Sequence, residues 1–283
     1  MKLATLRING GTAAARLDGD TYVLIDGYQD VGELLTAPCW ESIAAQGGGA
    51  TVSVSAADLA PLVPRPSKVV CVGMNYRSHI LEMGQPAPEH PTLFAKFADT
   101  LIGANDPIEL PAEDTAIDWE AELAVIIGKA GRRIPLSEAA EHIAGYSLCN
   151  DISMRTWQFR TGEWLQGKNW QNSTPLGPCL TTRDEWAPGA PIRALLNGEV
   201  VQDAPTDDLV HGPEGLISYV STMIQLNPGD VIITGTPDGV GFARTPQRFL
   251  TDGDLIEVSI DGLGALRNRA TASITAEAPV HAL

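Results

Sequence analysis

Turn signals recur along this chain at short intervals, a spacing that leaves room for many strands and few long helices. Asn9-Gly10 and Asp18-Gly19 separate short alternating segments near the start, and a further Asp-Gly pair separates two segments near the end. Such pairs favour tight hairpins. Glycine and proline supply 28 and 20 of the 283 residues, in line with a turn-rich fold. The sequence predicts a strand-dominated α+β protein without regular strand–helix alternation.

Charge and cysteine content narrow the classes of function. Lys and Arg number 19 against 35 Asp and Glu, a net charge of −16, which repels nucleic-acid phosphates. Cys39, Cys71, Cys149 and Cys179 stand too far apart to suggest a zinc site or a disulfide framework. No run approaches the roughly 18 apolar residues of a membrane span. We therefore expect a cytoplasmic protein that binds neither nucleic acid nor membrane.

Two units are expected along the chain. The run Gly47-Gly48-Gly49 and the proline-rich stretch 61–66 mark a boundary between them. Residues 1–65 form a small N-terminal β-rich domain, and residues 66–283 form the larger catalytic domain. A unit of about 60 residues buries little surface by itself, so the first should pack on the second.

The regular elements follow from apolar patterning. A buried strand is expected from residue 68, and others are expected over 119–127, 146–150, 231–234 and 255–260. Short helices are expected over 31–35 and over 137–144, the latter closed by Gly145 as a left-handed cap. The clearest helix is expected over 214–226, where apolar residues share one face.

The segment DWEAELAVIIG, residues 118–128, carries the most informative polar pattern. In a strand, Glu120 and Glu122 share a face and lie roughly 6.6 Å apart. They could form part of a solvated outer face, as most strand carboxylates do. However, Ala124 and Ile126 continue the same face as apolar residues, which indicates that the face is buried or lines a cavity. Since buried carboxylates are costly without a cation, the pattern favours a metal site.

Asp151, in the run SLCNDISMRTWQ, is a candidate third ligand. Its other interpretation is a helix cap, a frequent role of aspartate. If a helix follows, Arg155 and Gln158 lie on its face at i+4 and i+7. Three carboxylates form an all-oxygen set that suits Mg²⁺, Mn²⁺ or Ca²⁺ better than zinc, and they leave positions for a chelating substrate.

A possible base and a possible cation lie elsewhere in the chain. In a helical turn His79 and Glu82 meet at i,i+3, so that the glutamate could orient the imidazole as a base; the alternative is a surface pair. Lys168 stands between two tryptophans and could equally be an ordinary surface lysine. Thr236 lies in the glycine-rich stretch 234–241, which could bind a carboxylate but lacks the pattern of a phosphate loop.

The motifs together closely resemble one known family. GMNYRSHILEMG, FAKFADTLIGANDPIELP, DWEAELAVIIGK, GYSLCNDISMRTWQ, LNGE, LISYVSTMIQLNPGDVIITGTPDGVG and DGDLIEVSIDGLG occur in the order seen in the fumarylacetoacetate hydrolase (FAH) family, over about residues 66–270. The resemblance implies the FAH-type mixed β-roll, a homodimer, and a bound Mg²⁺ or Mn²⁺, with Ca²⁺ possible.

The resemblance also implies roles for single residues. It matches Glu120, Glu122 and Asp151 to metal ligands, His79 and Glu82 to a water-activating dyad, Lys168 to the group that stabilises an oxyanion, and Arg155, Gln158 and Thr236 to substrate-contacting positions. Lys96 stands where many members have lysine followed by proline, but Phe97 replaces that proline here.

The expected activity is that of a divalent-metal-dependent hydrolase. It would cleave a carbon–carbon bond in an acylpyruvate-like 2,4-dioxo acid, as in aromatic catabolism, through an enolate that the metal stabilises. The alternative is an isomerase or decarboxylase of a related oxo acid, of the 2-hydroxydienedioate isomerase or oxaloacetate decarboxylase type. An inert divalent-ion-binding protein would leave Lys168 and the His79/Glu82 pair without a purpose.

Overall fold

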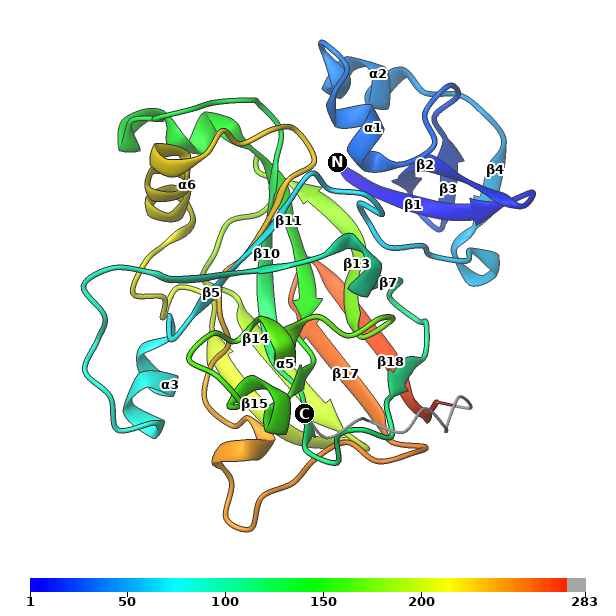
Figure 1. Cartoon of the computed structure of the whole chain (residues 1–283). Coiled ribbons are helices and arrows are strands. Elements are labelled where there is room, and N and C mark those ends of the chain that lie inside the picture. Colours follow the sequence, from blue (N-terminus) through cyan, green and yellow to red (C-terminus); the bar gives the residue numbers. More distant parts are fainter. Residues whose placement is uncertain (274–283) are drawn as a thin grey trace.

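The computed structural model describes residues 1–273, and strands dominate it (Figure 1). The N-terminal segment forms the expected hairpins, joined into a meander in which each strand pairs antiparallel with the next. The segment contains β1 (Lys2–Ile8), β2 (Gly11–Asp18), β3 (Thr21–Leu24), β4 (Thr51–Ser53), α1 (Val31–Leu35) and α2 (Trp40–Gln46). The expected helix over 31–35 is confirmed, and Asp30 caps it by accepting from the Glu33 N–H at 2.8 Å.

The central sheet continues directly from this meander. Among the described residues its strands run in the order β4-β3-β2-β1-β13-β11-β10-β16-β5-β6. The added strands are β13 (Thr174–Thr182), β11 (Ile143–Asn150), β10 (Ala121–Ile127), β16 (Val231–Ile233), β5 (Val69–Gly73) and β6 (Thr92–Lys96). β1 joins β13 with Lys2 opposite Thr181, so hydrogen bonding crosses the expected domain boundary at residue 65. The division into two domains stays a prediction.

Both faces of β10 are buried. Leu123 and Val125 pack into one core cluster, whereas Ala124 and Ile126 pack into a second cluster on the other side of the sheet. The expected alternation is therefore correct, and the face that carries Glu122 points into the protein. A strand buried on both sides holds its side chains rigidly, because neighbours on each face restrict their movement.

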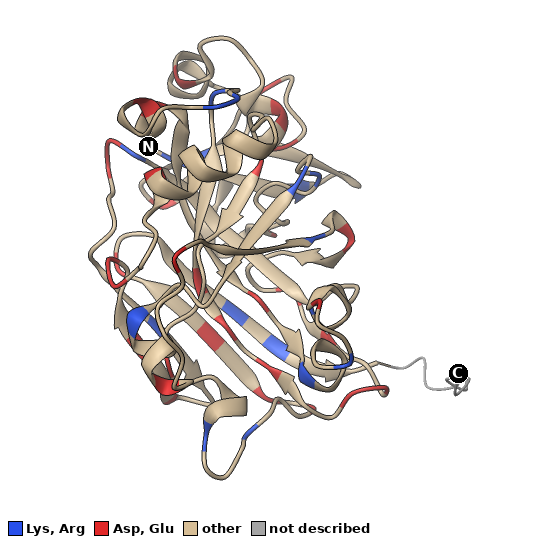
Figure 2. Ribbon diagram, turned by 60° about the vertical axis from the view of Figure 1, so that its left-hand side comes forward, with Lys and Arg blue, Asp and Glu red and all other residues tan. Residues whose placement is uncertain are grey.

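A second sheet covers the C-terminal half. Its order is β15-β14-β17-β18-β8, with β15 (Glu199–Pro205), β14 (Pro191–Leu196), β17 (Leu255–Ile260), β18 (Gly264–Ala272) and β8 (Ile108–Leu110). Its inner residues join the core cluster that contains Leu123, and its outer face carries charged residues of both signs (Figure 2). One ion pair there joins Arg267 to Glu257 at 2.8 Å. The strand-dominated α+β prediction and the mixed β-roll are confirmed.

Short helices border the sheets. Apart from α6 (Pro213–Met223), which confirms the helix expected over 214–226, they span only one turn or little more. Those that carry predicted site residues are α3 (Arg77–Glu82), α4 (Arg155–Gln158) and α5 (Leu165–Lys168).

The prediction of a helix over 137–144 closed by a glycine cap is wrong about where the helix ends. A 3₁₀ helix occupies Leu136–His142, and β11 begins at once with Ile143. Gly145 lies inside β11, where a Cβ atom would stand 2.2 Å from the Thr181 carbonyl oxygen of β13. The glycine therefore permits the close approach of a neighbouring strand and does not end a helix.

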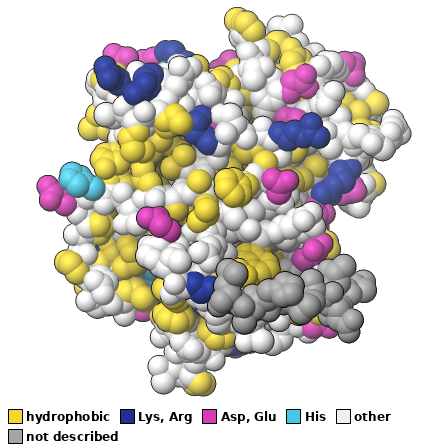
Figure 3. All heavy atoms as spheres, in the orientation of Figure 1, with side chains coloured by type: hydrophobic (Ala, Val, Ile, Leu, Met, Phe, Trp, Pro, Cys, Tyr) yellow, Lys and Arg dark blue, Asp and Glu magenta, His cyan; other side chains and the backbone are white. Residues whose placement is uncertain are grey.

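The surface leaves a few large apolar side chains exposed (Figure 3). Leu136, Met223 and Ile224 are examples around α6 and the 3₁₀ helix packed on it. All four cysteines are free thiols. Within residues 1–273 we find no helix with the length and apolar character needed to cross a bilayer.

Candidate active site

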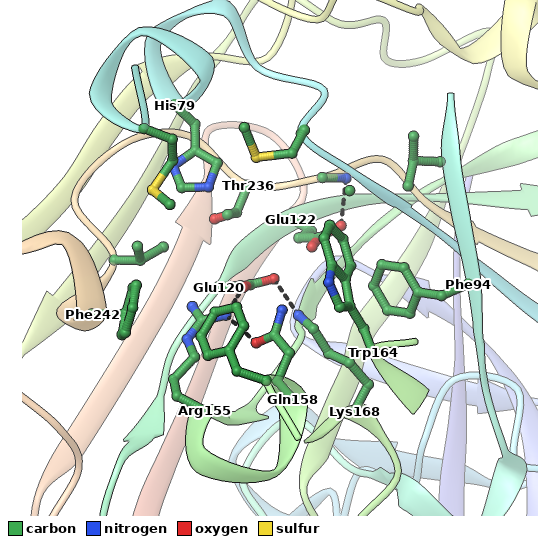
Figure 4. Close-up of a pocket in the computed structure, with 17 residues that line it drawn as sticks. His79, Phe94, Glu120, Glu122, Arg155, Gln158, Trp164, Lys168, Thr236 and Phe242 are labelled. Atoms are coloured by element: carbon green, nitrogen blue, oxygen red, sulfur yellow. Dashed lines mark hydrogen bonds and ion pairs between the residues drawn. The ribbon is translucent and has the colours of Figure 1, made fainter. Parts of the chain in front are cut away.

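A cleft opens where the loops after β5 and β16 meet the start of β10 (Figure 4). Glu120, Glu122, Lys168 and His79 contribute its polar lining. Its other walls are largely apolar, formed by Val72, Met74, Met83, Phe94, Phe159, Trp164, Val240 and Phe242. A largely apolar cleft with its charged groups clustered at one end is typical of small-molecule sites.

The three predicted carboxylates meet at the charged end. One ligand oxygen from each of Glu120, Glu122 and Asp151 lies within 4.8 Å of the others. The sheet register causes this, because Ala121 pairs with Asn150 and the Asp151 N–H donates to the Glu120 carbonyl at 2.9 Å. All three side chains are buried. The interpretation of Glu120 and Glu122 as a solvated face is therefore wrong.

Cations surround two of these carboxylates. Glu120 contacts the Nζ of Lys168 at 2.6 Å and Nη1 of Arg155 at 2.7 Å. Burial would raise the pKa of Glu120, but these two cations outweigh it and lower the pKa to about 2. Asp151 contacts Lys96 at 2.7 Å and Lys168 at 2.9 Å. Glu120 is thus held in the charged form, and two lysines pair with Asp151.

The surroundings of Glu122 differ from those of Glu120 and Asp151. Its carboxylate accepts a hydrogen bond from the Gly235 N–H at 2.5 Å, and within the described chain it has no ion pair. Burial raises its pKa well above the usual value, and the nearby Asp151 and Glu120 raise it further. A divalent ion among the three carboxylates would favour the ionised form of Glu122, and the all-oxygen donor set suits Mg²⁺ or Mn²⁺. The residues present therefore fit such an ion.

The predicted His79/Glu82 contact is present on α3. Nδ1 of His79 lies 2.9 Å from Oε2 of Glu82, and the imidazole lines the cleft (Figure 4). Oε1 of Glu82 also accepts from the Gly239 N–H at 3.0 Å. Burial opposes ionisation, yet the hydrogen bonds from His79 and Gly239 lower the pKa of Glu82. The His79 side of the pair is buried, at 9% exposed, whereas Glu82 reaches the surface. Among the described residues Nε2 of His79 has no hydrogen-bond partner.

Arg155 and Gln158 reach the site by a route that the sequence did not predict. The expected helix does not follow Asp151 directly, because Ser153–Met154 form β12, which pairs with β9 (Ile117–Asp118). Helix α4 begins only at Arg155, and Asp151 caps neither end of it. Nη1 of Arg155 still donates to Oε1 of Gln158 at 2.8 Å, so the two side chains act together.

Asp118 is a site residue that sequence reasoning missed. It is fully buried and accepts from Nε and Nη2 of Arg155 at 2.9 and 2.7 Å. It also accepts from the backbone N–H groups of Gly241 at 2.7 Å and Phe242 at 3.0 Å. The alternation that placed Glu120 and Glu122 on one face also includes Asp118, two residues earlier, so the signal was available.

Both candidate lysines are buried. Lys168 is 2% exposed, so its interpretation as a surface lysine is wrong. Burial disfavours its ammonium form, but Asp151 and Glu120 outweigh this and raise the pKa of Lys168, which therefore stays cationic. Lys96 is also 2% exposed and reaches Asp151 although Phe97 follows it. The oxyanion-stabilising role of Lys168 stays a prediction.

The geometry of the cleft indicates a class of protein. A buried carboxylate group that can hold a divalent ion, beside an imidazole oriented by a glutamate, is typical of metal-dependent acid–base enzymes. A sequence model of the fumarylacetoacetate (FAA) hydrolase C-terminal domain matches residues 68–271. The chain therefore belongs to the fumarylacetoacetate hydrolase family.

Curated relatives share nearly half of the aligned residues. The mitochondrial oxaloacetate tautomerase FAHD2A of Homo sapiens is 46% identical over 215 residues, which span 75% of this chain and 68% of the relative. The mitochondrial oxaloacetate tautomerase fahd2 of Xenopus laevis is 44% identical over 214 residues, 74% of this chain and 67% of the relative. These relatives contradict the expected cytoplasmic location, which we withdraw, because cysteine spacing does not distinguish one reducing compartment from another.

Solved structures agree in fold. A fumarylacetoacetate hydrolase from Exiguobacterium antarcticum has a TM-score of 0.85 and 30% identity, covering 96% of this chain and 100% of that one. A 2-hydroxyhepta-2,4-diene-1,7-dioate isomerase from Mycobacterium marinum has a TM-score of 0.79 and 29% identity, covering 96% and 99%. A maleylpyruvate hydrolase from Sphingobium sp. SYK-6, solved with manganese and pyruvate, has a TM-score of 0.80 and 28% identity, covering 96% and 100%.

Proposed function

We propose that this protein is a divalent-metal-dependent tautomerase that interconverts the keto and enol forms of oxaloacetate or a similar 2-oxo dicarboxylate. The observation that carries the proposal is the partly uncompensated carboxylate group of Glu120, Glu122 and Asp151 beside the oriented imidazole of His79. The names of the relatives that are 44% and 46% identical support the choice of substrate.

The three carboxylates would hold Mg²⁺ or Mn²⁺. When bound, the ion supplies Lewis-acid stabilisation of negative charge on the substrate. The neighbouring manganese-bound hydrolase supports this choice of metal. Lys168, Lys96 and Arg155 form ion pairs with Glu120 and Asp151 and so fix these two carboxylates in position as ligands.

His79 supplies the proton transfer. Glu82 accepts from Nδ1–H and so leaves Nε2 with a lone pair directed to the cleft. Nε2 would take a proton from C3 of the keto acid, the C–H electrons would form the C2=C3 bond, and the C2=O π electrons would move to the oxygen. The protonated imidazole would then return the proton to the C2 oxygen. The net reaction moves one proton and consumes no water. The apolar side chains of Phe94 and Trp164 line the wall beside Lys168 (Figure 4).

Hydrolysis of an acylpyruvate is the second candidate. The same Nε2 could take a proton from water, and the structural neighbour named maleylpyruvate hydrolase favours this reaction. We rank it below tautomerisation because that neighbour is 28% identical, against 46% for a relative named as a tautomerase. Dienedioate isomerisation and oxaloacetate decarboxylation pass through the same kind of enolate and are tested with it.

The deciding experiment presents oxaloacetate, an acylpyruvate and a dienedioic oxo acid to the protein, each with Mg²⁺ and with a chelator. Tautomerisation accelerates the decay of the oxaloacetate enol absorbance without release of carbon dioxide. Uptake of ¹⁸O from labelled water into the acid released from the acylpyruvate would favour hydrolysis, and carbon dioxide would favour decarboxylation. If Mg²⁺ accelerates no reaction of oxaloacetate, the proposed function is wrong.

A further inference from the structure

Gln202, on β15 of the second sheet, extends a buried side chain to the edge of the cleft. It is 2% exposed, and none of the steps above uses it. Its Oε1 accepts from the Ala121 N–H at 3.0 Å, and its Nε2 donates to the Pro237 carbonyl at 2.9 Å and to Oγ1 of Thr236 at 2.8 Å. The backbone partners fix the amide orientation, since an N–H needs an acceptor and a carbonyl needs a donor.

This orientation decides what the Thr236 hydroxyl can do. Because Oγ1 accepts a hydrogen from Gln202, the single hydroxyl proton of Thr236 must point elsewhere. Within the described chain that proton has no acceptor. Thr236 lines the cleft and lies near His79 and Glu122 (Figure 4). The hydroxyl is therefore presented to a ligand as a donor.

The cations of the cleft strengthen this point. Arg155 donates to Asp118, Glu120 and Gln158, and Lys168 donates to Glu120 and Asp151. Most of the hydrogen-bond donors of these two side chains are therefore already engaged by protein acceptors. A neutral donor with an uncommitted proton is then a direct way to recognise an oxygen of the substrate.

We infer that Gln202 is a positioning residue that fixes Thr236 as a hydrogen-bond donor to an anionic oxygen of the bound 2-oxo acid. The inference rests on the proposed function for the class of ligand. It adds a selection rule, because a ligand oxygen that accepts is favoured at this position and a hydroxyl group that must donate is not. It also assigns a role in ligand binding to a residue of the second sheet.

The test measures the affinity of oxalate, a non-reacting analogue with two carboxylates, by calorimetry in the presence of Mg²⁺. Thr236→Val should weaken oxalate binding roughly 10- to 100-fold, the value of one hydrogen bond to a charged acceptor, whereas Thr236→Ser should bind like the wild type. Gln202→Glu keeps the shape but replaces the donor by an acceptor, which turns the Thr236 proton away from the cleft. It should therefore weaken binding as much as Thr236→Val.

The double variant separates positioning from a second direct contact. If Gln202 acts through Thr236, adding Gln202→Glu to Thr236→Val should weaken binding by less than about threefold more. Should Gln202→Glu fail to fold, Gln202→Met lacks the donor at nearly the same length. Its effect should be smaller than that of Thr236→Val, because a freely rotating hydroxyl can still donate.

Asn268 offers a matched control. It is a fully buried amide that donates to the Gly103 and Asp106 carbonyls, outside the cleft lining. Asn268→Asp should destabilise the protein and leave oxalate affinity unchanged. Independent effects in the double variant, equal binding by Thr236→Val and Thr236→Ser, or no oxalate binding by the wild type would overturn the inference. If the expected ranking of affinities holds but oxaloacetate is not tautomerised, only the proposed function fails.

Discussion

Two buried acidic regions of this protein are neutralised in different ways. Asp230, before β16, is fully buried and forms an ion pair with Lys68, and it also accepts from the Asn227 N–H at 2.7 Å. One carboxylate there faces one cation. Around the cleft, by contrast, the described residues place the carboxylates of Asp118, Glu120, Glu122 and Asp151 against the cations of Lys96, Arg155 and Lys168.

The difference separates a structural ion pair from a site built for a ligand. A buried charge is expensive unless it is compensated, so a fold that needs only stability balances each acid, as Lys68 balances Asp230. The cleft retains an acid, Glu122, that forms no ion pair with any of residues 1–273. This uncompensated carboxylate is where a divalent ion contributes most. The predictions below vary one region while the other serves as the control.

His79→Ala should have the largest effect on turnover, because it removes the proposed base. It leaves the carboxylates and cations of both acidic regions in place. Turnover of oxaloacetate should fall by about 10²- to 10⁴-fold, the usual contribution of a general base. Mn²⁺ affinity, followed by the loss of the free-ion signal in electron paramagnetic resonance, should not change. Unchanged turnover would remove His79 from the mechanism.

Glu122→Gln should weaken Mn²⁺ binding by more than roughly 100-fold, since the loss of a ligand should exceed the loss of a supporting residue. Asp230→Asn is the matched variant in the balanced region and should leave Mn²⁺ affinity as in the wild type. Equal Mn²⁺ affinities in the two variants would contradict the distinction between the regions.

Asp118→Asn should affect both stability and the site. Breaking its buried pair with Arg155 should cost about 3–5 kcal/mol of unfolding free energy, and Asp230→Asn should cost a similar amount, as measured by urea denaturation. Arg155 also forms an ion pair with Glu120, so Asp118→Asn should weaken Mn²⁺ binding about 10- to 100-fold relative to the wild type, as is typical for residues that support metal ligands. A pure stability effect would place Asp118 with Asp230 as a structural acid.

Glu82 gives the smallest expected effect, on acid stability. Its pKa is lowered in the folded protein from the ordinary 4.5, so its stabilisation is present above pH 4.5 and is lost as pH falls through the folded pKa. The difference in unfolding free energy between wild type and Glu82→Gln should therefore be constant above pH 4.5 and shrink below it. Denaturant titrations across this range measure it, and a difference that grows in acid would contradict the assignment.

The sequence correctly predicted the features that depend on residues close together along the chain. Alternation correctly placed Glu122 on a buried face, and the i,i+3 spacing correctly joined His79 to Glu82. The hairpins of the N-terminal meander followed from their turn residues. The resemblance to the family also grouped Glu120, Glu122 and Asp151 as one set of ligands, and the folded chain brings these three carboxylates together.

The remaining features depend on contacts between distant segments. Gly145 looked like a helix cap, because the approach of β13 that requires it comes from residues some 36 positions later. Gln202 and Thr236 belong to separate loops and strands that only the folded sheets bring together. The location of the protein was mispredicted because composition and cysteine spacing do not encode a compartment.

The most direct test of this account is anomalous diffraction from crystals grown with Mn²⁺. The account predicts one manganese peak per chain, within coordination distance of carboxylate oxygens from Glu120, Glu122 and Asp151, on the side of the cleft that His79 faces. A peak elsewhere, or none at saturating Mn²⁺, would contradict the claim that these three carboxylates bind a catalytic metal ion.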